Sequence, residues 1–589
     1  MPSVNGATIV NLGDVFVSAL STINPEGDGG AVNLLSNSNL SAETIDASGL
    51  VNGGNITVTA DEIDLIGGST SVISQGELLL QPLNPAQPIA IAASSNQLGT
   101  LTLKTSDLAA LGDGFSQIVI GRDDSSGQIE LLETVTFVDP TSIQATGTGG
   151  SIFTPFTIST SGNLLNLQAD GRISVSDITS NGGGVEIISN SGDVAANNIT
   201  SNGGDISLTA ASDPTGINPA IAFTSLDSNS ESGAGGAITL TAQGDIVGAA
   251  GGMIALGSAV GVDSGPLSVF TPGSVEFNSF SISSNGADLQ IGDGTINPTA
   301  VAIAGNVSTG GGDLRVNSTG SLEFGAAGNT SQTLGGIFEL TAGGSILLFS
   351  DGIETNGGDI SITGSGIGIF TDADPFVAIN STGGVGGNIT ITATTSGINL
   401  GASSIDSGNL IRLNAATNAN VGTLTAAGGD VEIGTEGFSF PQTVEIGGTV
   451  FTNGGNFRAS SSGDIVFSDF LGSANTSGGI VTLTAGGAVL LPDNGIFSSG
   501  GNITINGSTV ATVFTDGLTT LNSVGGVGDI TIAATTNGID LNGSAINSGG
   551  SIDLDAAGNI NTGSLTTDGG NITIGSENLP QTVAIAGNV

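Results

Sequence analysis

The chain has 589 residues, of which 99 are Gly, 10% are charged and none is Cys, His, Trp or Tyr. Without Cys and His there are no disulfides, no thiol chemistry and none of the usual zinc or iron sites, and the commonest general acid–base side chain is missing. Six basic residues against 52 acidic ones give a net charge of −46, which disfavours nucleic acid and anionic membranes as partners.

The sequence shows neither the pattern of a transmembrane helix nor that of a signal peptide. The sequence has no run of about 18 apolar residues, so we expect no transmembrane helix and no direct membrane insertion. No basic residue precedes the short apolar run Val15–Leu20, so this segment is unlike a signal peptide. We therefore expect export to depend on a leader that is not present in this chain.

Residues 1–160 are the less regular part of the sequence. They contain apolar runs at 78–91 and 101–104, followed by a predicted short helix from Ser106 to Gly112, with Ser106 as its N-cap and Gly112 at its C-terminal end. An apolar segment to Arg122 and a strand over 128–131 come next. Between them, Asp123–Gly127 is interpreted as a hairpin turn.

A short unit recurs throughout the chain. It has two small or Gly residues, then Asn or Asp, then apolar residues alternating with Thr or Ser. Alternation predicts a half-buried strand, and the Gly-Gly-Asn/Asp lead predicts a turn because Gly and Asn tolerate positive φ. Examples are Gly53–Val58, Gly203–Leu208, Gly357–Ile362, Gly386–Ile391 and Gly569–Ile574.

The spacing of these units indicates a higher-order repeat. The second Gly falls at 312, 336, 358, 387, 408, 429 and 455, and the order of long and short steps then repeats through 479, 501, 528, 550 and 570. The segments Pro298–Val307, Pro441–Val450 and Pro580–Val589 match one another, and a more diverged copy begins near Gly162. We therefore divide the chain into residues 1–160 and three super-repeats over 161–306, 307–449 and 450–589.

A period of 20–29 residues with several short strands predicts an all-β fold, an elongated right-handed parallel β-helix (β-solenoid). Leucine-rich repeats would show L-x-x-L-x-L, and propeller blades need about 40 residues. One coil buries too little apolar surface to offset the cost of ordering its backbone, so about 25 coils are expected to stack about 4.8 Å apart. Nothing resembling a cap follows Val589, so we expect a longer parent protein or self-association, end to end or laterally.

One block resembles a known family. It runs from Leu83-Asn-Pro through Gly114-Phe115, Ile120-Gly121-Arg122-Asp123 and Gly127 to Ile129, and it resembles a module of very large bacterial β-strand-repeat surface proteins. The remaining coils are similar to filamentous-haemagglutinin-type β-helical adhesin passengers. The resemblance implies an exported adhesin at a bacterial cell surface. The Asn-Pro-Asn-Gly-Ile motif of the two-partner-secretion domain is absent, which leaves the export route open.

The sequence offers candidates for three kinds of site. Some β-helices cleave polysaccharides with clustered carboxylates beside a cation, and Asp123 and Asp124 next to Arg122 are the compact candidate here; the turn interpretation is the alternative. Asp372, Asp374 and Asp516 are weak calcium candidates at corresponding corners of two copies, where Asp also caps turns. Thr-x-Thr pairs suggest an ice-binding array, although Thr is also favoured on strands; examples are Thr390 with Thr392 and Thr482 with Thr484.

These patterns together predict a non-enzymatic, acidic, extracellular β-solenoid of a bacterial cell-surface protein. It is expected to have a structural or adhesive role, as part of a fibre or surface layer. Surface glycans or other cells are its expected partners. No cofactor is expected, and calcium is the ion considered. The alternatives are a carbohydrate-binding or polysaccharide-degrading β-helix, or a calcium-stabilised surface repeat.

Overall fold

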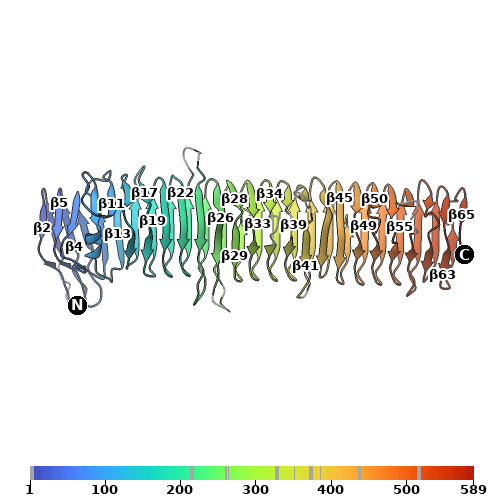
Figure 1. Ribbon diagram of the computed structural model, residues 1–589, viewed down its shortest axis with the longest axis horizontal. Helices are drawn as coiled ribbons and strands as arrows, with labels where there is room; N and C mark the ends of the chain where they lie inside the picture. Colours follow the sequence, from blue (N-terminus) through green and yellow to red (C-terminus); the bar gives the residue numbers. More distant parts are fainter. Residues whose placement is uncertain are drawn as a thin grey trace. The chain divides into compact units, whose positions relative to one another are not determined.

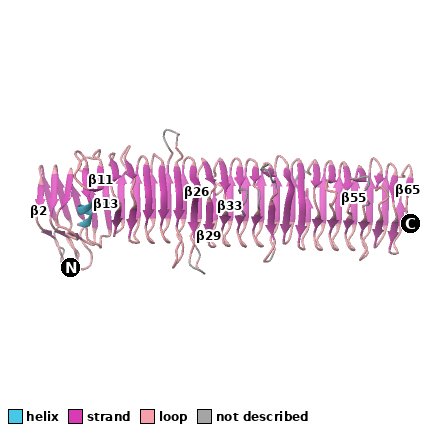
Figure 2. Ribbon diagram, viewed as in Figure 1, coloured by secondary structure: helices cyan, strands magenta, loops and turns pink. Residues whose placement is uncertain are grey.

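The computed structural model describes residues 6–212, 216, 218–258, 262, 264–325, 331–349, 352–369, 376–384, 386–435, 440–513 and 519–589. The chain is a parallel β-solenoid of about 23 turns, with about 51% strand and almost no helix, which confirms the predicted fold class. It consists of two compact units, residues 1–298 and 299–589. Within each unit, strands of consecutive coils lie side by side (Figures 1 and 2).

Sheet A takes one strand from each coil, and neighbouring strands pair in parallel. In the first unit its strands are β1 Ala7–Asn11, β4 Val32–Ser36, β7 Ile56–Thr59, β10 Glu77–Gln81, β13 Gln117–Arg122, β16 Thr141–Ala145, β19 Leu165–Ala169, β21 Val185–Ser189, β23 Ile206–Ala210, β25 Ile238–Ala242, β27 Leu267–Phe270 and β30 Leu289–Ile291. In the second unit they are β33 Leu314–Ser318, β36 Phe338–Ala342, β39 Ile360–Gly364, β42 Ile389–Ala393, β44 Ile411–Ala415, β46 Val431–Ile433, β49 Phe457–Ser461, β52 Val481–Ala485, β55 Ile503–Gly507, β58 Ile530–Ala534, β61 Ile552–Ala556 and β64 Ile572–Ile574.

Sheet B contains the strands that complete each coil. A typical coil of the second unit follows β49 with β50 Asp464–Phe467 and β51 Ala474–Asn475, and then returns to sheet A at β52. In the first coils of the first unit, two three-stranded sheets take this place. They are formed by β2 Val15–Val17, β5 Asn39–Ala42 and β8 Glu62–Leu65, and by β3 Leu20–Ser21, β6 Ile45–Asp46 and β9 Val72–Ile73.

The strand register agrees closely with the spacing of the glycines. Phe457 pairs with Val481, Val481 with Ile503 and Ile503 with Ile530. These coils therefore have 24, 22 and 27 residues, as the sequence predicts. Where Ile389 pairs with Ile411, the coil has 22 residues against a predicted 21. The loops that join the strands absorb the differences in length.

Alternate residues of each strand point into a thin apolar core. On β49, Phe457, Ala459 and Ser461 are buried while the residues between them reach solvent. The Phe457 ring packs edge-on against Phe467 from β50, with centroids 6.4 Å apart. Phe470 lies outside this core, with its side chain 59% exposed.

The turn that leads back to sheet A has the sequence Thr/Ser-x-Gly-Gly, and its two glycines serve different purposes. At Asn453 and Gly454 the φ angles are 44° and 106°, a left-handed region that Gly and Asn adopt at low cost. At Gly455 a side chain is excluded sterically, because a Cβ would lie 1.9 Å from the carbonyl oxygen of Gly429 in the preceding coil. The second glycine is therefore required by the close stacking of the coils.

Buried hydroxyl groups close these turns from the inside. The Thr or Ser side chain donates a hydrogen bond of 2.5–2.6 Å to the carbonyl oxygen of the second Gly, in pairs such as Thr333 with Gly336 and Thr476 with Gly479. The Thr476 side chain is fully buried. A polar group buried beneath a turn needs such a partner, because an unpaired one costs about 1–3 kcal/mol.

The Asn or Asp after the two glycines links neighbouring coils. Its Oδ1 accepts a hydrogen bond from the main-chain N–H at the equivalent position of the next coil, at 2.7–2.9 Å. The bond from Ile480 N to Asn456 Oδ1 is one example. The recurring Asn/Asp is therefore a bridge between coils as well as a turn residue.

The helix of the first unit differs from its prediction. Helix α1 spans Thr105–Ala109 with Lys104 as N-cap, so the prediction of Ser106 as N-cap and of an end at Gly112 is wrong. The Asp107 carboxylate accepts the main-chain N–H of Lys104 at 2.7 Å, which fixes the start of the helix. Its end is set by β9, because Val72 exchanges main-chain hydrogen bonds with Ala110 and Gly112.

The predicted hairpin at Asp123–Gly127 is also wrong. Strand β13 pairs with β10 and β16 in sheet A. The following strand, β14 Gln128–Leu131, pairs instead with β11 Ile89–Ala93 and β17 Ser151–Thr154 in sheet B. The segment between them is thus a corner of a coil, because in a solenoid each strand pairs with the neighbouring coils and not with the next strand along the chain.

Candidate functional site

All six basic side chains of the chain are in ion pairs. Lys104 pairs with Asp64, Arg122 with Asp124, Arg172 with Asp193, Arg315 with Asp313 and Glu339, Arg412 with Glu432, and Arg458 with Asp430 and Glu432. Each cation is therefore already matched to a carboxylate of the chain, and the acidic excess remains for solvent and counter-ions.

The acid pair beside Arg122 has the geometry of a loop anchor. Arg122 Nε and Nη2 donate to the two carboxylate oxygens of Asp124 at 2.6 and 3.0 Å, and Nη1 donates to the carbonyl oxygens of Pro82 and Leu83 at 3.2 Å. The bond from Arg122 lowers the pKa of Asp124. A general acid needs a raised pKa, so this geometry favours the role of Arg122 in holding the corner against the preceding coil.

The calcium candidates Asp372, Asp374 and Asp516 all lie outside the described residues. Within the described ranges, no group of three or more acidic side chains is placed to hold a metal ion. The calcium prediction at these three positions therefore stays a prediction.

The Thr-x-Thr pairs lie on sheet A, on β42 and β52. Thr390, Thr482 and Thr484 reach solvent, whereas Thr392 is buried. At the level of Thr390, the intervening strands carry Arg412, Glu432 and Arg458 before Thr482 is reached. A threonine surface that is continuous over many coils is thus interrupted between Thr390 and Thr482 by charged side chains.

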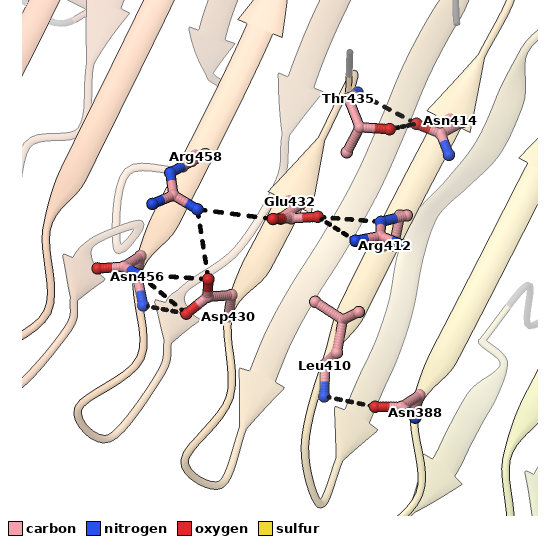
Figure 3. Close-up of polar contacts among 9 residues, drawn as sticks. All are labelled: Asn388, Leu410, Arg412, Asn414, Asp430, Glu432, Thr435, Asn456 and Arg458. Carbon is pink, nitrogen blue, oxygen red and sulfur yellow. Dashed lines mark hydrogen bonds and ion pairs between the residues drawn. The ribbon is translucent and has the colours of Figure 1, made fainter. Parts of the chain in front are cut away.

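Those charged side chains form a ladder across three coils (Figure 3). Arg412 Nε and Nη2 donate to Glu432 Oε2 at 2.9 and 2.8 Å, and Arg458 Nη1 lies 3.3 Å from Asp430 Oδ2 and 3.6 Å from Glu432 Oε1. Asn456 joins the network through its bonds to Asp430. Sequence reasoning missed this ladder, although Glu432 and Arg458 each follow the second Gly of their unit by three residues.

A buried acidic cluster lies where α1 and β12 Leu101–Lys104 contact β8 in the first unit. Glu62 is 8% exposed; its Oε2 accepts the Thr102 N–H at 3.4 Å, and its Oε1 has no partner within the described residues. Burial raises the pKa of Glu62 from 4.5 to about 7, and burial also raises the pKa of Asp107. No local pattern revealed this cluster, because Thr102 is 40 residues from Glu62.

The second unit has a groove of about 490 Å³ on sheet B. It crosses β37 Ile346–Leu348, β40 Ile367–Ile369, β43 Ile398–Ser407, β45 Asn418–Ala426 and β47 Thr443–Ile446. The register aligns one outward residue from each strand along its floor. These residues are Leu347, Gly368, Asn399, Asn420 and Glu445.

The groove is hollow at Gly368 and polar beyond it. Gly368 has no side chain between Leu347 and Asn399, and among the described residues a Cβ placed there would meet only Leu347 Cδ2, at 3.7 Å. Asn420 Nδ2 donates to Asn399 Oδ1 at 3.2 Å. Each amide carries two N–H donors and a carbonyl acceptor, so the stacked pair retains hydrogen-bonding capacity for a ligand.

Comparisons with known proteins leave the chain without a named relative. No model of a protein family matches it, and neither a curated protein nor a solved structure does. In the described part of the chain, no helix is long and apolar enough to span a lipid bilayer. The stacked coils of the structure show a β-helical repeat protein.

Proposed function

We propose that the chain is a non-catalytic, extracellular β-solenoid of a bacterial cell-surface protein, with a structural and adhesive role. The observation that carries the proposal is the repetition of one scaffold: a glycine turn, a buried hydroxyl and an Asn/Asp bridge recur from coil to coil. Such a scaffold presents side chains at regular intervals over a long surface, which suits adhesion or assembly.

The electrostatic character of the chain supports the same proposal. With every basic side chain in an ion pair and a net charge of −46, the surface repels nucleic acid and anionic lipid. The proposed partners are other copies of the chain, surface glycans or other cells. The resemblance of residues 83–129 to a module of bacterial surface proteins supports export.

The location is tested on intact cells of the organism that encodes the chain. Antibody against residues 299–589 should label unpermeabilised cells, and external protease should remove the signal. Labelling only after permeabilisation contradicts the extracellular part of the proposal. Deletion of the gene should reduce attachment of the cells to surfaces or to one another. Unchanged attachment would contradict the adhesive part.

The absence of catalysis is tested with purified protein. Incubation with acidic and neutral polysaccharides should release no reducing ends or unsaturated products. Cleavage that is lost in both Asp123→Asn and Asp124→Asn variants, but retained in Asp177→Asn on the same unit, would contradict the proposal and support the polysaccharide-degrading alternative.

A further inference from the structure

We infer that the sheet B groove of the second unit binds a neutral, linear oligosaccharide. The inference deepens the proposed adhesive function and rests on it for its biological role, whereas the binding itself is a property of the purified protein. The length of the groove, the chemistry of its floor and the charge around it all favour such a ligand.

The groove has the dimensions of an extended ligand. It crosses five neighbouring strands, β37, β40, β43, β45 and β47. Since adjacent strands lie about 4.8 Å apart, it runs for about 19 Å along the stack of coils. A ligand lying in it crosses the strands and meets a new outward side chain at every coil. A linear chain of sugar units, each with its own hydroxyl groups, suits such a periodic floor.

The floor offers hydrogen bonds rather than apolar contact. Asn399 and Asn420 stack in its middle, and the exposed Ser396 lies at its rim. Amide and hydroxyl groups both donate and accept, as sugar hydroxyls do. Leu347, at the end of the floor next to Gly368, is the large apolar side chain that faces outward here, so the groove does not suit the apolar face of a peptide helix.

The charge of the groove favours a neutral ligand. Glu445, at the other end of the floor, is the charged residue among the described residues that line the groove. An anionic glycan would be repelled by this carboxylate and by the net charge of −46. Among the described residues, no aromatic side chain lines the groove to stack on a sugar ring. The expected affinity is therefore modest, with a dissociation constant of about 0.1–1 mM.

Gly368 allows a test that leaves the scaffold in place. Because a Cβ at this position meets, among the described residues, only a side-chain atom at 3.7 Å, Gly368→Phe should fold and fill the hollow part of the groove. Asn420→Leu keeps the size of the side chain but removes its amide. The matched control is Ala511→Phe, which places the same ring on an outward position of sheet B, on β56 Thr509–Thr512, outside the groove.

The experiment titrates the purified 589-residue chain with hexasaccharides of β-1,4-glucan, β-1,3-glucan, α-1,4-glucan and chitin, and with oligogalacturonate, using calorimetry and saturation-transfer NMR. At least one neutral hexasaccharide should bind saturably and independently of salt. Gly368→Phe and Asn420→Leu should weaken that binding about tenfold or more, and Ala511→Phe should leave it unchanged. Circular dichroism should show folded protein in every case.

Four results would overturn the inference. They are no saturable binding of any neutral hexasaccharide, tighter binding of oligogalacturonate, binding that salt abolishes, and binding that persists in folded Asn420→Leu and Gly368→Phe. If Gly368→Phe does not fold, the Asn420→Leu result decides alone. Failure of this inference leaves surface labelling and cell attachment unaffected, so it is distinguishable from failure of the proposed function.

Discussion

Adjacent glycines of one turn, Gly478 and Gly479, should respond very differently to the same substitution. A Cβ at Gly479 would lie 1.9 Å from the Gly455 carbonyl oxygen and 2.5 Å from its carbon. These atoms belong to backbone, so no side chain can rotate away. Reaching the 3.0 Å that real Cβ atoms respect requires the coils to separate locally by about 1 Å. That separation lengthens the main-chain hydrogen bonds between β49 and β52.

The control substitution is at Gly478, where φ is 118° and a Cβ would meet nothing within 4 Å. Gly478→Ala should therefore cost only the backbone strain of a left-handed residue, about 1–2 kcal/mol. Gly479→Ala adds a backbone overlap, and we expect it to cost about 4 kcal/mol, in the range that marks severe core defects.

Because solenoids unfold in parts, the assay must be local. Hydrogen exchange followed by mass spectrometry should show faster exchange over residues 455–507 in Gly479→Ala than in Gly478→Ala, and urea unfolding should give the global midpoints. If Gly479→Ala exchanges no faster than Gly478→Ala, the second glycine is not required by coil stacking and the reasoning fails.

Three further predictions concern polar groups. Thr476→Val leaves the Gly479 carbonyl without its 2.6 Å donor and should cost about 1–3 kcal/mol in urea unfolding, while the outward Thr482→Val should stay within about 0.5 kcal/mol; equal effects would contradict the role of the buried hydroxyl. The raised pKa of Glu62, about 7 against 4.5, means that its protonated form is favoured by folding. The free energy of unfolding of the first unit should therefore fall as pH rises from 4.5 through 7. The loss should be up to about 3 kcal/mol, because each tenfold change in proton affinity corresponds to about 1.4 kcal/mol. Glu62→Gln should flatten this dependence in thermal unfolding, and an unchanged slope would refute the assignment. Arg412→Leu breaks an ion pair whose Arg side chain is 40% exposed, so it should cost at most about 1 kcal/mol, and less at high salt; a larger, salt-independent loss in urea unfolding would show that packing dominates.

The regular part of the fold follows from the sequence because its signals are local. Alternation of Ile, Leu and Val with Thr and Ser marks each sheet A strand, and the pair of glycines marks the turn before it. The distances between those glycines predicted the coil lengths of 24, 22 and 27 residues that the pairing of Phe457, Val481, Ile503 and Ile530 realises. Each strand and turn signal is a short stretch of chain, and the coil length is the distance from one such stretch to the next.

Features that depend on the neighbouring coil were decided only by tertiary structure. The corner at Asp123–Gly127 resembles a hairpin locally, but its strands pair with other coils. Glu62 meets Thr102 across 40 residues, and Gly368 forms a hollow only because Leu347 and Asn399 stand beside it. The physical reason is that lateral contacts in a solenoid connect residues one coil apart, and loop lengths, which vary between coils, set which residues those are.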